Sequence, residues 1–461
     1  MTEQRRPLVV INVVGLTPGL LGANTPHLNR LIDDGFLATL EGVFPAVTCT
    51  AQASMLTGLT PTDHGIVGNG WYFRDLAEIL FWRQPNWLIE GEKVWQAARK
   101  ARPGSSCAQL FWWYNMYADV DWSVTPRPIY PADGRKIPAL YSEPNELWVS
   151  LEQQLGPFPF FDFWGPRSGI RSSQWIAAAA RAVFDAQRPD LSLVYLPHLD
   201  YNMQRLGPDD PAVRADVRAI DQVAGELVEH LRGAGAELLI VSEYGLEQAS
   251  GVVHINRVLR GQGLLRVRDT LGWELLDPGA SRAFAVADHQ VAHVYVRDPQ
   301  DLARVRRLLQ ATPGIERVLD EADKAAWGIA HLRAGELVAV AEPGHWFSYY
   351  YWLDDARAPD FGRTVDIHRK PGYDPAELFL DPDLPLPKAK IAWRLLQKRL
   401  GFRTLLDVIP LKAELVRGTH GRPAASTDTG PLLIGTRKAL ASNRLPMTGV
   451  KDLVLRHLSS G

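Results

Sequence analysis

The chain has 461 residues, 46% of them hydrophobic, and a formal net charge of −2 with basic residues scattered along its length. These values are typical of a globular protein with a large core, and they indicate neither a nucleic-acid-binding nor a membrane-binding surface, so a small molecule is the expected partner. The two cysteines, Cys49 and Cys107, exclude a disulfide framework and a CxxC metal site, which favours a cytoplasmic location. Nothing in the composition indicates an oligomeric state.

The amino-terminal segment predicts a strand followed by a helix. Residues 8–14 form an apolar run without a signal-peptide cleavage site, which is typical of a strand buried on both faces in a parallel sheet. No run along the chain reaches the ~18 apolar residues of a membrane helix. Thr25 and Pro26 then supply an N-cap and a proline at the first helical position, and Gly35 ends the helix.

The same alternation recurs after residue 170. A helical apolar stripe over 175–184 precedes the strand 191–196, and a helix that begins at Asp210 and Pro211 and closes at Gly233 precedes the strand 237–243. Alternating strands and helices of this kind predict an α/β fold with a mainly parallel central sheet. In such sheets, functional sites gather at the carboxyl ends of the strands.

The pattern of predicted strands and helices changes after about residue 250. A small βαββ unit is predicted from the segments 293–296, 302–309, 315–319 and 336–342, and it is followed by an aromatic block and a proline-rich passage. We therefore interpret 255–390 as an inserted α+β cap. The core consists of 1–254 and 391–461, with a last strand at 431–435.

Thr48 stands at a predicted strand-to-helix junction, in the stretch FPAVTCTAQASMLTG (44–58). Its hydroxyl would lie beside the free N–H groups of a helix amino terminus, which favour an anion. An isolated threonine at such a position is more often a simple helix cap. The surrounding sequence decides between these interpretations.

The segment FPAVTCTAQASMLTGLTPTDHGIVGN (44–69) resembles the nucleophile segment of the alkaline phosphatase superfamily, most closely its nucleotide pyrophosphatase/phosphodiesterase branch. Three later segments resemble further blocks of that family in the same order: LPHLDYNMQRLGP (196–208), VSEYGL (241–246) and GTHG (418–421). The resemblance implies an alkaline-phosphatase-like three-layer sandwich. It also implies that Thr48 attacks phosphorus and that Asn69 donates a hydrogen bond to a phosphoryl oxygen.

The family's two-metal site is only partly matched. Asp200, His420 and Thr48 fit its pattern, whereas Val14 and Gln204 replace an aspartate and a histidine, and Glu243 and Tyr244 replace an Asp-His pair. Asp200, His420 and Gln204 would suit one divalent ion, Zn²⁺, Mn²⁺ or Mg²⁺, while Glu243 and Thr48 remain of the second site. We expect at most one well-formed metal site, with Glu243 or Tyr244 hydrogen-bonded to Thr48 as a substitute base.

Other histidines are candidates for compensating ligands. If 286–296 forms one strand, His289 and His293 lie about 13 Å apart at ~3.3 Å per residue, too far to share an ion, and each is more simply structural. Asp366 and His368 are the best auxiliary candidates, because the basic residues around them could face an anionic substrate.

An aromatic cluster begins directly after Asn69. It is most simply core packing, but its first residues would line the rim of the site, where an aromatic ring could stack on a flat leaving group and an arginine could meet a second phosphate. The predicted rim residues are Trp71, Tyr72, Phe73 and Arg74.

The resemblance implies a phosphoric ester hydrolase, of the phosphodiesterase or nucleotide pyrophosphatase type, that works through a phosphothreonine intermediate and a divalent metal on a small phosphorylated, nucleotide-like substrate. Two alternatives remain open. One is a catalytically impaired member that binds a phosphorylated ligand without turnover, which Val14 and Tyr244 favour. The other is a phosphotransferase or mutase of the same fold.

Overall fold

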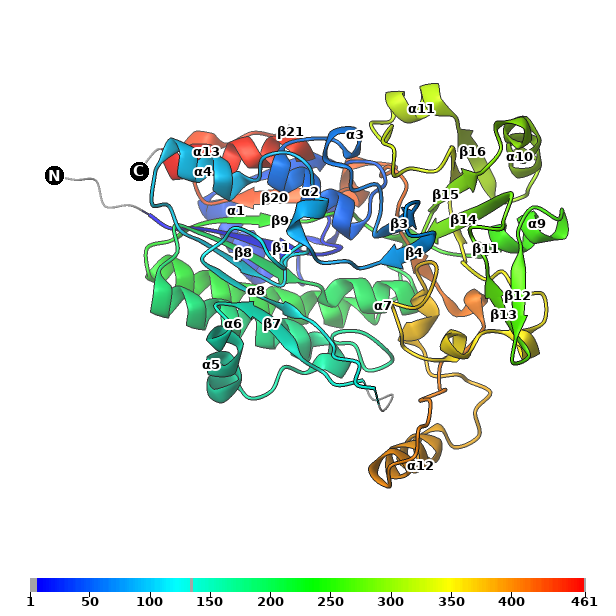
Figure 1. The fold of residues 1–461 in the computed structure, drawn as a ribbon. Helices are drawn as coiled ribbons and strands as arrows, with labels where there is room; N and C mark the ends of the chain where they lie inside the picture. The colour runs from blue at the N-terminus through cyan, green and yellow to red at the C-terminus, as the bar shows by residue number, and fades with distance from the viewer. Residues whose placement is uncertain (1–5, 133–135, 460–461) are drawn as a thin grey trace.

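The computed structural model describes residues 6–132 and 136–459, and its largest element is a nine-stranded sheet of order β21-β2-β20-β9-β1-β8-β5-β6-β7 (Figure 1). At its centre β1 (Leu8–Val13) lies between β8 (Leu191–Leu196) and β9 (Glu237–Val241) and runs parallel to both. The three strands predicted from apolar runs are thus confirmed as neighbours. Their carboxyl ends meet at one edge of the sheet.

The flanking strands make the sheet mixed but mostly parallel. On one side β5 (Cys107–Leu110) and β6 (Trp122–Pro126) continue the parallel arrangement, and β7 (Leu140–Glu143) closes the edge antiparallel. On the other side β20 (Leu432–Gly435) runs antiparallel to both of its neighbours, β9 and β2 (Phe36–Glu41), and β21 (Arg444–Pro446) is parallel to β2. The predicted α/β class is confirmed.

Helices cover both faces of this sheet because β1 is apolar on both sides. Val9, Ile11 and Val13 pack with the layer of α1 (Pro26–Asp34), α6 (Ile170–Gln187) and α8 (Val213–Gly233). Leu8 and Val10 pack with the layer of α2 (Thr48–Thr57), α4 (Val94–Ala101) and α13 (Val450–Ser459). The result is the expected three-layer sandwich.

A second sheet of four antiparallel strands has the order β14-β15-β17-β16. Its bounds are Ala283–Asp288 for β14, Val291–Val296 for β15, Ile315–Leu319 for β16 and Leu337–Ala341 for β17, with α10 (Leu302–Gln310) between β15 and β16. The predicted βαββ unit is confirmed, whereas a single strand over 286–296 is wrong, because the chain reverses between β14 and β15. The limits 255–390 of the cap stay a prediction.

Smaller elements join the two sheets. The hairpin of β3 (Gly70–Phe73) and β4 (Glu78–Phe81) packs on β14, and β11 (Gly251–Val253) pairs with β18 (His345–Phe347). In the described part of the chain, none of the helices combines the length and apolar character that spanning a membrane requires.

Candidate active site

Thr48 is the first residue of α2, a helix buried along its whole length and ended by Gly58 in the left-handed conformation. The first N–H groups of a helix lack intrahelical partners and face the approach to Thr48. One of them, on Cys49, donates to Oδ1 of Asn69 at 3.0 Å. The prediction that Thr48 stands at the start of a helix is therefore correct. Asn69 binds the amino terminus of that helix through this hydrogen bond.

Tyr244 links Thr48 to Asp200. Its hydroxyl lies 3.0 Å from Oγ1 of Thr48. Tyr244 itself comes shortly after β9, which ends at Val241. Burial raises the pKa of Asp200 to about 7, and hydrogen bonds from Gln204 and Tyr244 offset part of that rise. A carboxyl group with such a pKa can accept or release a proton near neutral pH. The phenol of Tyr244 thus stands beside both the hydroxyl of Thr48 and a potential base, whose Oδ1 has no hydrogen-bond partner among the described residues.

Glu243 is held by two side-chain amides. Its Oε1 accepts hydrogen bonds of 2.6 Å from Nδ2 of Asn12 and from Nε2 of Gln52. Burial raises the pKa of Glu243 to about 8 in spite of these bonds, so the protonated form is favoured at neutral pH. Neutral amides therefore surround the carboxyl group that the resemblance assigns to a metal.

Asn12 and Gln52 were missed by sequence reasoning. A signal for Asn12 was present, because it is the one polar residue inside the apolar run that forms β1. Gln52 lies in α2, four residues and about one helical turn after Thr48, so both side chains are on the same face of the helix.

The hydrogen-bonding capacity of Asn69 is used within the protein. Its Nδ2 donates to Oδ1 of Asp288 at 3.1 Å, and its backbone N–H donates to Oδ2 of the same residue at 2.8 Å. Asp288 comes from the end of β14, and burial raises its pKa to about 6. The second sheet thus supplies a carboxyl group to the site, which the sequence did not indicate.

His289 lies in the site, contrary to the expectation of a structural histidine. It occupies the turn between β14 and β15 with φ +56°, and its Nδ1 is 2.8 Å from Oδ1 of Asp288. Its ring is sandwiched between those of His420 and Tyr373, each 3.7 Å away between ring centroids. His293, by contrast, is structural as expected, since its Nε2 donates to the carbonyl of Val67 at 2.9 Å.

The same stack continues to Tyr244, whose ring lies parallel to that of His420 at 3.7 Å. Nδ1 of His420 donates to the carbonyl of Ala46 at 2.8 Å, which leaves Nε2 as a buried acceptor without a partner among the described residues. Burial holds the pKa of His420 well below its usual value, so the ring is neutral.

The side chains fit the expected metal ions poorly. Nε2 of His420 lies 3.9 Å from Oδ1 of Asp200, a separation that two ligands of one ion can have. Gln204, however, turns its Nε2 to Asp200 at 2.6 Å, and its oxygen accepts from Tyr373 at 2.9 Å. Val14 is buried in the apolar core. No three His, Cys, Asp or Glu side chains gather around a common point in the part of the chain that the structure describes. The residues present do not make a two-metal centre, and the expected single site has only Asp200 and His420.

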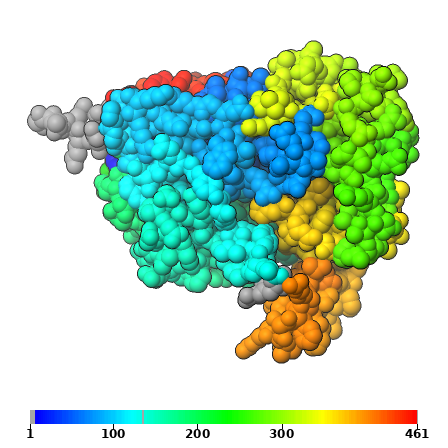
Figure 2. Space-filling model, in the orientation of Figure 1, coloured from blue at the N-terminus to red at the C-terminus, as the bar shows by residue number. Residues whose placement is uncertain are grey.

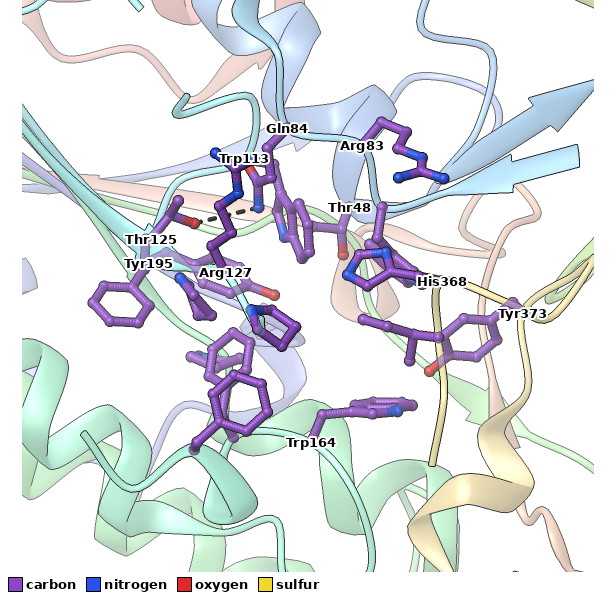
Figure 3. Close-up of a pocket in the computed structure, with 18 of the residues that line it drawn as sticks. Thr48, Arg83, Gln84, Trp113, Thr125, Arg127, Trp164, Tyr195, His368 and Tyr373 are labelled. Atoms are coloured by element: carbon purple, nitrogen blue, oxygen red, sulfur yellow. Dashed lines mark hydrogen bonds between the residues drawn. The ribbon is translucent and has the colours of Figure 1, made fainter. Parts of the chain in front are cut away.

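A cavity of about 420 Å³ leads to Thr48 (Figure 3). Its walls are mainly aromatic, and Trp82 and Trp113 contact each other there at 4.7 Å between ring centroids. Further aromatic side chains in the lining are Phe111, Tyr117, Tyr130, Phe160, Phe163, Trp164, Tyr195, Tyr201 and Tyr373. Arg83, Arg127 and Lys136 add positive charge. Thr48, Asp200, Tyr244, His289 and His420 all belong to this lining.

The four predicted rim residues lie elsewhere. Trp71 is buried and stacks with Phe73 at 5.0 Å, Tyr72 packs edge-on against Tyr295 of β15, and Arg74 forms an ion pair with Glu336 at 2.8 Å. The physical reason is the hairpin of β3 and β4, which turns the first half of the aromatic cluster onto the second sheet. Within the aromatic cluster, the first residues that line the cavity are Trp82 and Arg83, which follow β4.

The two auxiliary candidates are separated. His368 lines the cavity, and burial lowers its pKa to about 4, so it is neutral. Asp366 lies beside Arg369 at 3.7 Å and is not part of the cavity lining.

Comparison with known sequences finds relatives at low identity. A pyrophosphatase/phosphodiesterase of Schizosaccharomyces pombe is 25% identical over 250 residues, which are 51% of this chain and 42% of that protein. Human bis(5'-adenosyl)-triphosphatase ENPP4 is 24% identical over 238 residues, 49% of this chain and 44% of that protein. The matches thus span less than half the length of these curated relatives.

Solved structures share the fold. Murine ectonucleotide pyrophosphatase/phosphodiesterase 5, as an inactive threonine-to-alanine variant in complex with AMP, has a TM-score of 0.59 at 18% identity, with 99% of this chain and 95% of that chain covered. Phosphonoacetate hydrolase from Sinorhizobium meliloti, in complex with phosphonoformate, has a TM-score of 0.62 at 15% identity, with 99% and 96% covered.

The family model described as type I phosphodiesterase/nucleotide pyrophosphatase matches residues 8–374, from β1 through the second sheet to the site residue Tyr373. This match covers most of the chain and contains Thr48, Asp200, Tyr244 and His289. The chain belongs to the type I phosphodiesterase/nucleotide pyrophosphatase family.

Proposed function

We propose that the protein hydrolyses a phosphoric ester, of the phosphodiesterase or nucleotide pyrophosphatase type, with Thr48 as the nucleophile. The observation that carries this proposal is the position of Thr48 at the amino terminus of α2, in the wall of the cavity and 3.0 Å from the hydroxyl of Tyr244. The murine relative solved with AMP was inactivated by replacing a threonine, which supports the assignment of the nucleophile.

In the first step, Oγ1 of Thr48 bonds to phosphorus while the bond to the leaving oxygen breaks. The threonine proton passes to Tyr244, and the phenol proton passes to Asp200, which then returns a proton to the leaving oxygen. The N–H groups at the start of α2 stabilise the charge that develops on the phosphoryl oxygens.

In the second step, water attacks the phosphothreonine and gives its proton to Asp200. Oγ1 of Thr48 leaves phosphorus and recovers a proton through Tyr244, which restores the starting state. No step is assigned to a metal-bound water, because Gln204 and Glu243 are engaged with other side chains. Turnover in the presence of EDTA and of Zn²⁺, Mn²⁺ or Mg²⁺ measures whether the reaction requires a metal ion.

The cavity supports a substrate with a flat apolar group beside the phosphoryl centre. Aromatic walls such as those of Trp82 and Trp113 suit a nucleobase or another ring, and Arg83 suits a second anionic group. A nucleotide-like phosphodiester is therefore the substrate class we propose.

Binding without turnover is the second candidate. Two observations favour it: Asn69 is hydrogen-bonded to Asp288, and Glu243 is hydrogen-bonded to two side-chain amides. Neither side chain is then free to bind a phosphoryl group or a metal. Transfer of the phosphoryl group to an alcohol instead of water is a variant of the proposed reaction and would show as a phosphorylated acceptor.

The test compares wild type with Thr48→Ala and Thr48→Ser on p-nitrophenyl phosphodiesters and monoesters, with EDTA and with each of the three metal ions. We expect turnover that is lost in Thr48→Ala, retained in part by Thr48→Ser, and accompanied by a phosphothreonine detectable by mass spectrometry after acid quench. Turnover that survives in Thr48→Ala would refute the nucleophile. A wild type that binds AMP with no turnover under any metal condition would establish the binding protein.

A further inference from the structure

Helix α12 (Pro387–Arg399) projects from the body of the molecule at the lower edge of Figure 1, and Figure 2 shows it as a separate lobe. Pro387 occupies the first helical position, and Lys398 and Arg399 lie in the last turn, where positive charge stabilises a helix. None of its residues is buried. The helix is therefore well formed by its sequence but covers no core.

The polar side of α12 is the side engaged within the protein. Lys390 contacts Asp407 at 2.9 Å and Arg394 contacts the same carboxylate at 3.0 Å, which fastens the helix to the returning chain. A surface helix of a globular protein normally packs its apolar stripe inward and turns its charges to water. In α12 this arrangement is reversed.

The apolar face of α12 is consequently open. Trp393, Leu396 and Leu400 follow one another at helical spacing and are 58%, 46% and 64% exposed. Phe402, just beyond the helix, is 64% exposed. Several large apolar side chains that are exposed next to one another indicate an interaction surface, whereas single exposed apolar residues are ordinary.

The charged residues of this segment are all positive. Residues 387–403 contain no aspartate or glutamate and six basic residues, namely Lys388, Lys390, Arg394, Lys398, Arg399 and Arg403. A short helix with Trp, Leu and Phe on one side and Lys and Arg around them has the chemistry of an element that lies in the headgroup region of an anionic bilayer. Its 13 residues extend about 20 Å, too short to span the ~30 Å hydrocarbon core.

Residues that line the cavity lie close in the chain to the contact of this segment with the rest of the protein. Arg403 donates to the carbonyl of Ala132 at 2.8 Å, and Lys136, a few residues further along the chain, lines the cavity. Tyr130, just before Ala132, also lines the cavity and is half exposed. A surface that contacts α12 would therefore lie beside the entrance to Thr48.

We propose that α12 and residues 400–405 dock the protein on an anionic lipid surface, with Trp393, Leu396, Leu400 and Phe402 inserted among the acyl chains and the exposed Lys388 and Arg399 at the headgroups. This revises the initial expectation of no membrane contact, because the whole-chain charge of −2 conceals a local basic segment. The proposal goes beyond the proposed function and does not depend on it.

Co-sedimentation of the full-length protein with vesicles tests the proposal. We expect binding to vesicles of phosphatidylcholine mixed with phosphatidylglycerol, weak binding to phosphatidylcholine alone, and a decrease in binding as salt is raised. The variant Trp393→Ser/Leu396→Ser/Leu400→Ser should bind at least about tenfold more weakly, because the inserted apolar area is lost. Lys388→Glu/Arg399→Glu should lose the preference for phosphatidylglycerol.

The matched control is Leu271→Ser/Leu332→Ser, which removes two exposed leucines outside α12 and should bind vesicles like wild type. The mutated leucines and tryptophan of α12 are not buried, so circular dichroism and the melting temperature should not change. The proposal is overturned if wild type does not bind the mixed vesicles at low salt, or if the triple variant binds as tightly as wild type. A wild-type dimer that becomes a monomer in the triple variant, without vesicle binding, would assign the face to a second copy of the chain.

Discussion

Tyr244 makes three kinds of contact at once in the candidate site. Its hydroxyl is hydrogen-bonded to Thr48, its ring lies flat on His420, and its phenol lies close enough to Asp200 to lower the pKa of that carboxyl. Burial raises its own pKa well above the usual value, so it stays a neutral phenol that can both accept and donate a proton. These contacts make Tyr244 the residue on which the proposed proton path depends.

Tyr244→Phe should separate this role from packing. The substitution keeps the ring on His420 and removes only the hydroxyl, so we expect Thr48-dependent turnover to fall by about 10²-fold or more, with a loss of about 1 kcal/mol in the free energy of unfolding. Turnover of p-nitrophenyl substrates and urea unfolding measure the two effects. The matched control is Tyr349→Phe, a buried tyrosine of the apolar cluster of the second sheet, which should keep turnover. Equal turnover in Tyr244→Phe and wild type would contradict the proton path.

The metal ligands can be restored residue by residue. The variant Val14→Asp/Gln204→His/Glu243→Asp/Tyr244→His recreates the pattern that the family resemblance implies, and it should bind about two Zn²⁺ per chain, whereas wild type should retain less than one after dialysis. Without metal, the carboxylate introduced at the buried position of Val14 lacks a partner, so Zn²⁺ should raise the melting temperature of this variant more than that of wild type.

Elemental analysis and thermal unfolding provide both measurements for this variant. Adding His420→Ala should remove the gain at the site formed with Asp200. Stoichiometric zinc in dialysed wild type would show instead that Asp200 and His420 suffice as protein ligands.

At the scale of elements, the predictable parts were those with a strong local pattern. The apolar run of β1 and the caps of α1 predicted both elements almost to the residue, and the order of the family blocks predicted where Thr48 and Asp200 lie. The hairpin at His289 was not predicted, because Asp288, His289 and Gln290 contain neither the glycine nor the asparagine that usually marks such a turn. Hydrogen-bond partners such as Gln52 and Glu243 depend on tertiary packing, which no local pattern encodes.

Gly35 joins α1 to β2 with a single residue, and the space there is closed. A Cβ at Gly35 would lie 2.0 Å from the carbonyl oxygen of Gly435, a backbone atom of β20. Gly35→Ala should therefore force β2 and β20 apart and lower the free energy of unfolding by about 2–3 kcal/mol. Denaturant unfolding measures this. Gly233→Ala, at the end of α8 with open space around it, should change stability by less than about 1 kcal/mol. Similar stability in both variants would refute the steric argument.

At the scale of the whole molecule, the site brings together buried carboxyl groups from separate parts of the chain. Asp200 follows β8, Glu243 follows β9 and Asp288 ends β14, so folding places all three in one poorly hydrated region. Burial raises the pKa of each, to about 7, 8 and 6 respectively. These carboxyl groups therefore take up protons on folding at neutral pH, so they make the stability of the chain depend on pH.

The direction of this pH dependence follows from whether the folded or the unfolded chain binds more protons. A carboxyl group with a raised pKa holds its proton more tightly in the folded chain, so its contribution to stability is lost as pH rises toward the folded pKa. Buried histidines, among them His64, with a pKa of about 3, and His293, with a pKa of about 4, act in the opposite direction, because histidines of the unfolded chain still bind protons around pH ~6.5. The carboxyl groups dominate only above about pH 7.5.

We therefore expect Glu243 to reduce the free energy of unfolding by about 2 kcal/mol between pH 6.5 and 8, measured as the difference in slope between wild type and a variant that cannot ionise at this position. Denaturant unfolding at a series of pH values measures the slope. Glu243→Gln keeps an acceptor for Asn12 and Gln52 but cannot ionise, so its slope should lack the part from Glu243 and keep the parts from Asp200 and the histidines. The exposed Glu414→Gln should keep the slope of wild type. Equal slopes in Glu243→Gln and wild type would mean that Glu243 is already ionised in the folded chain, and that a cation rather than a proton balances its charge.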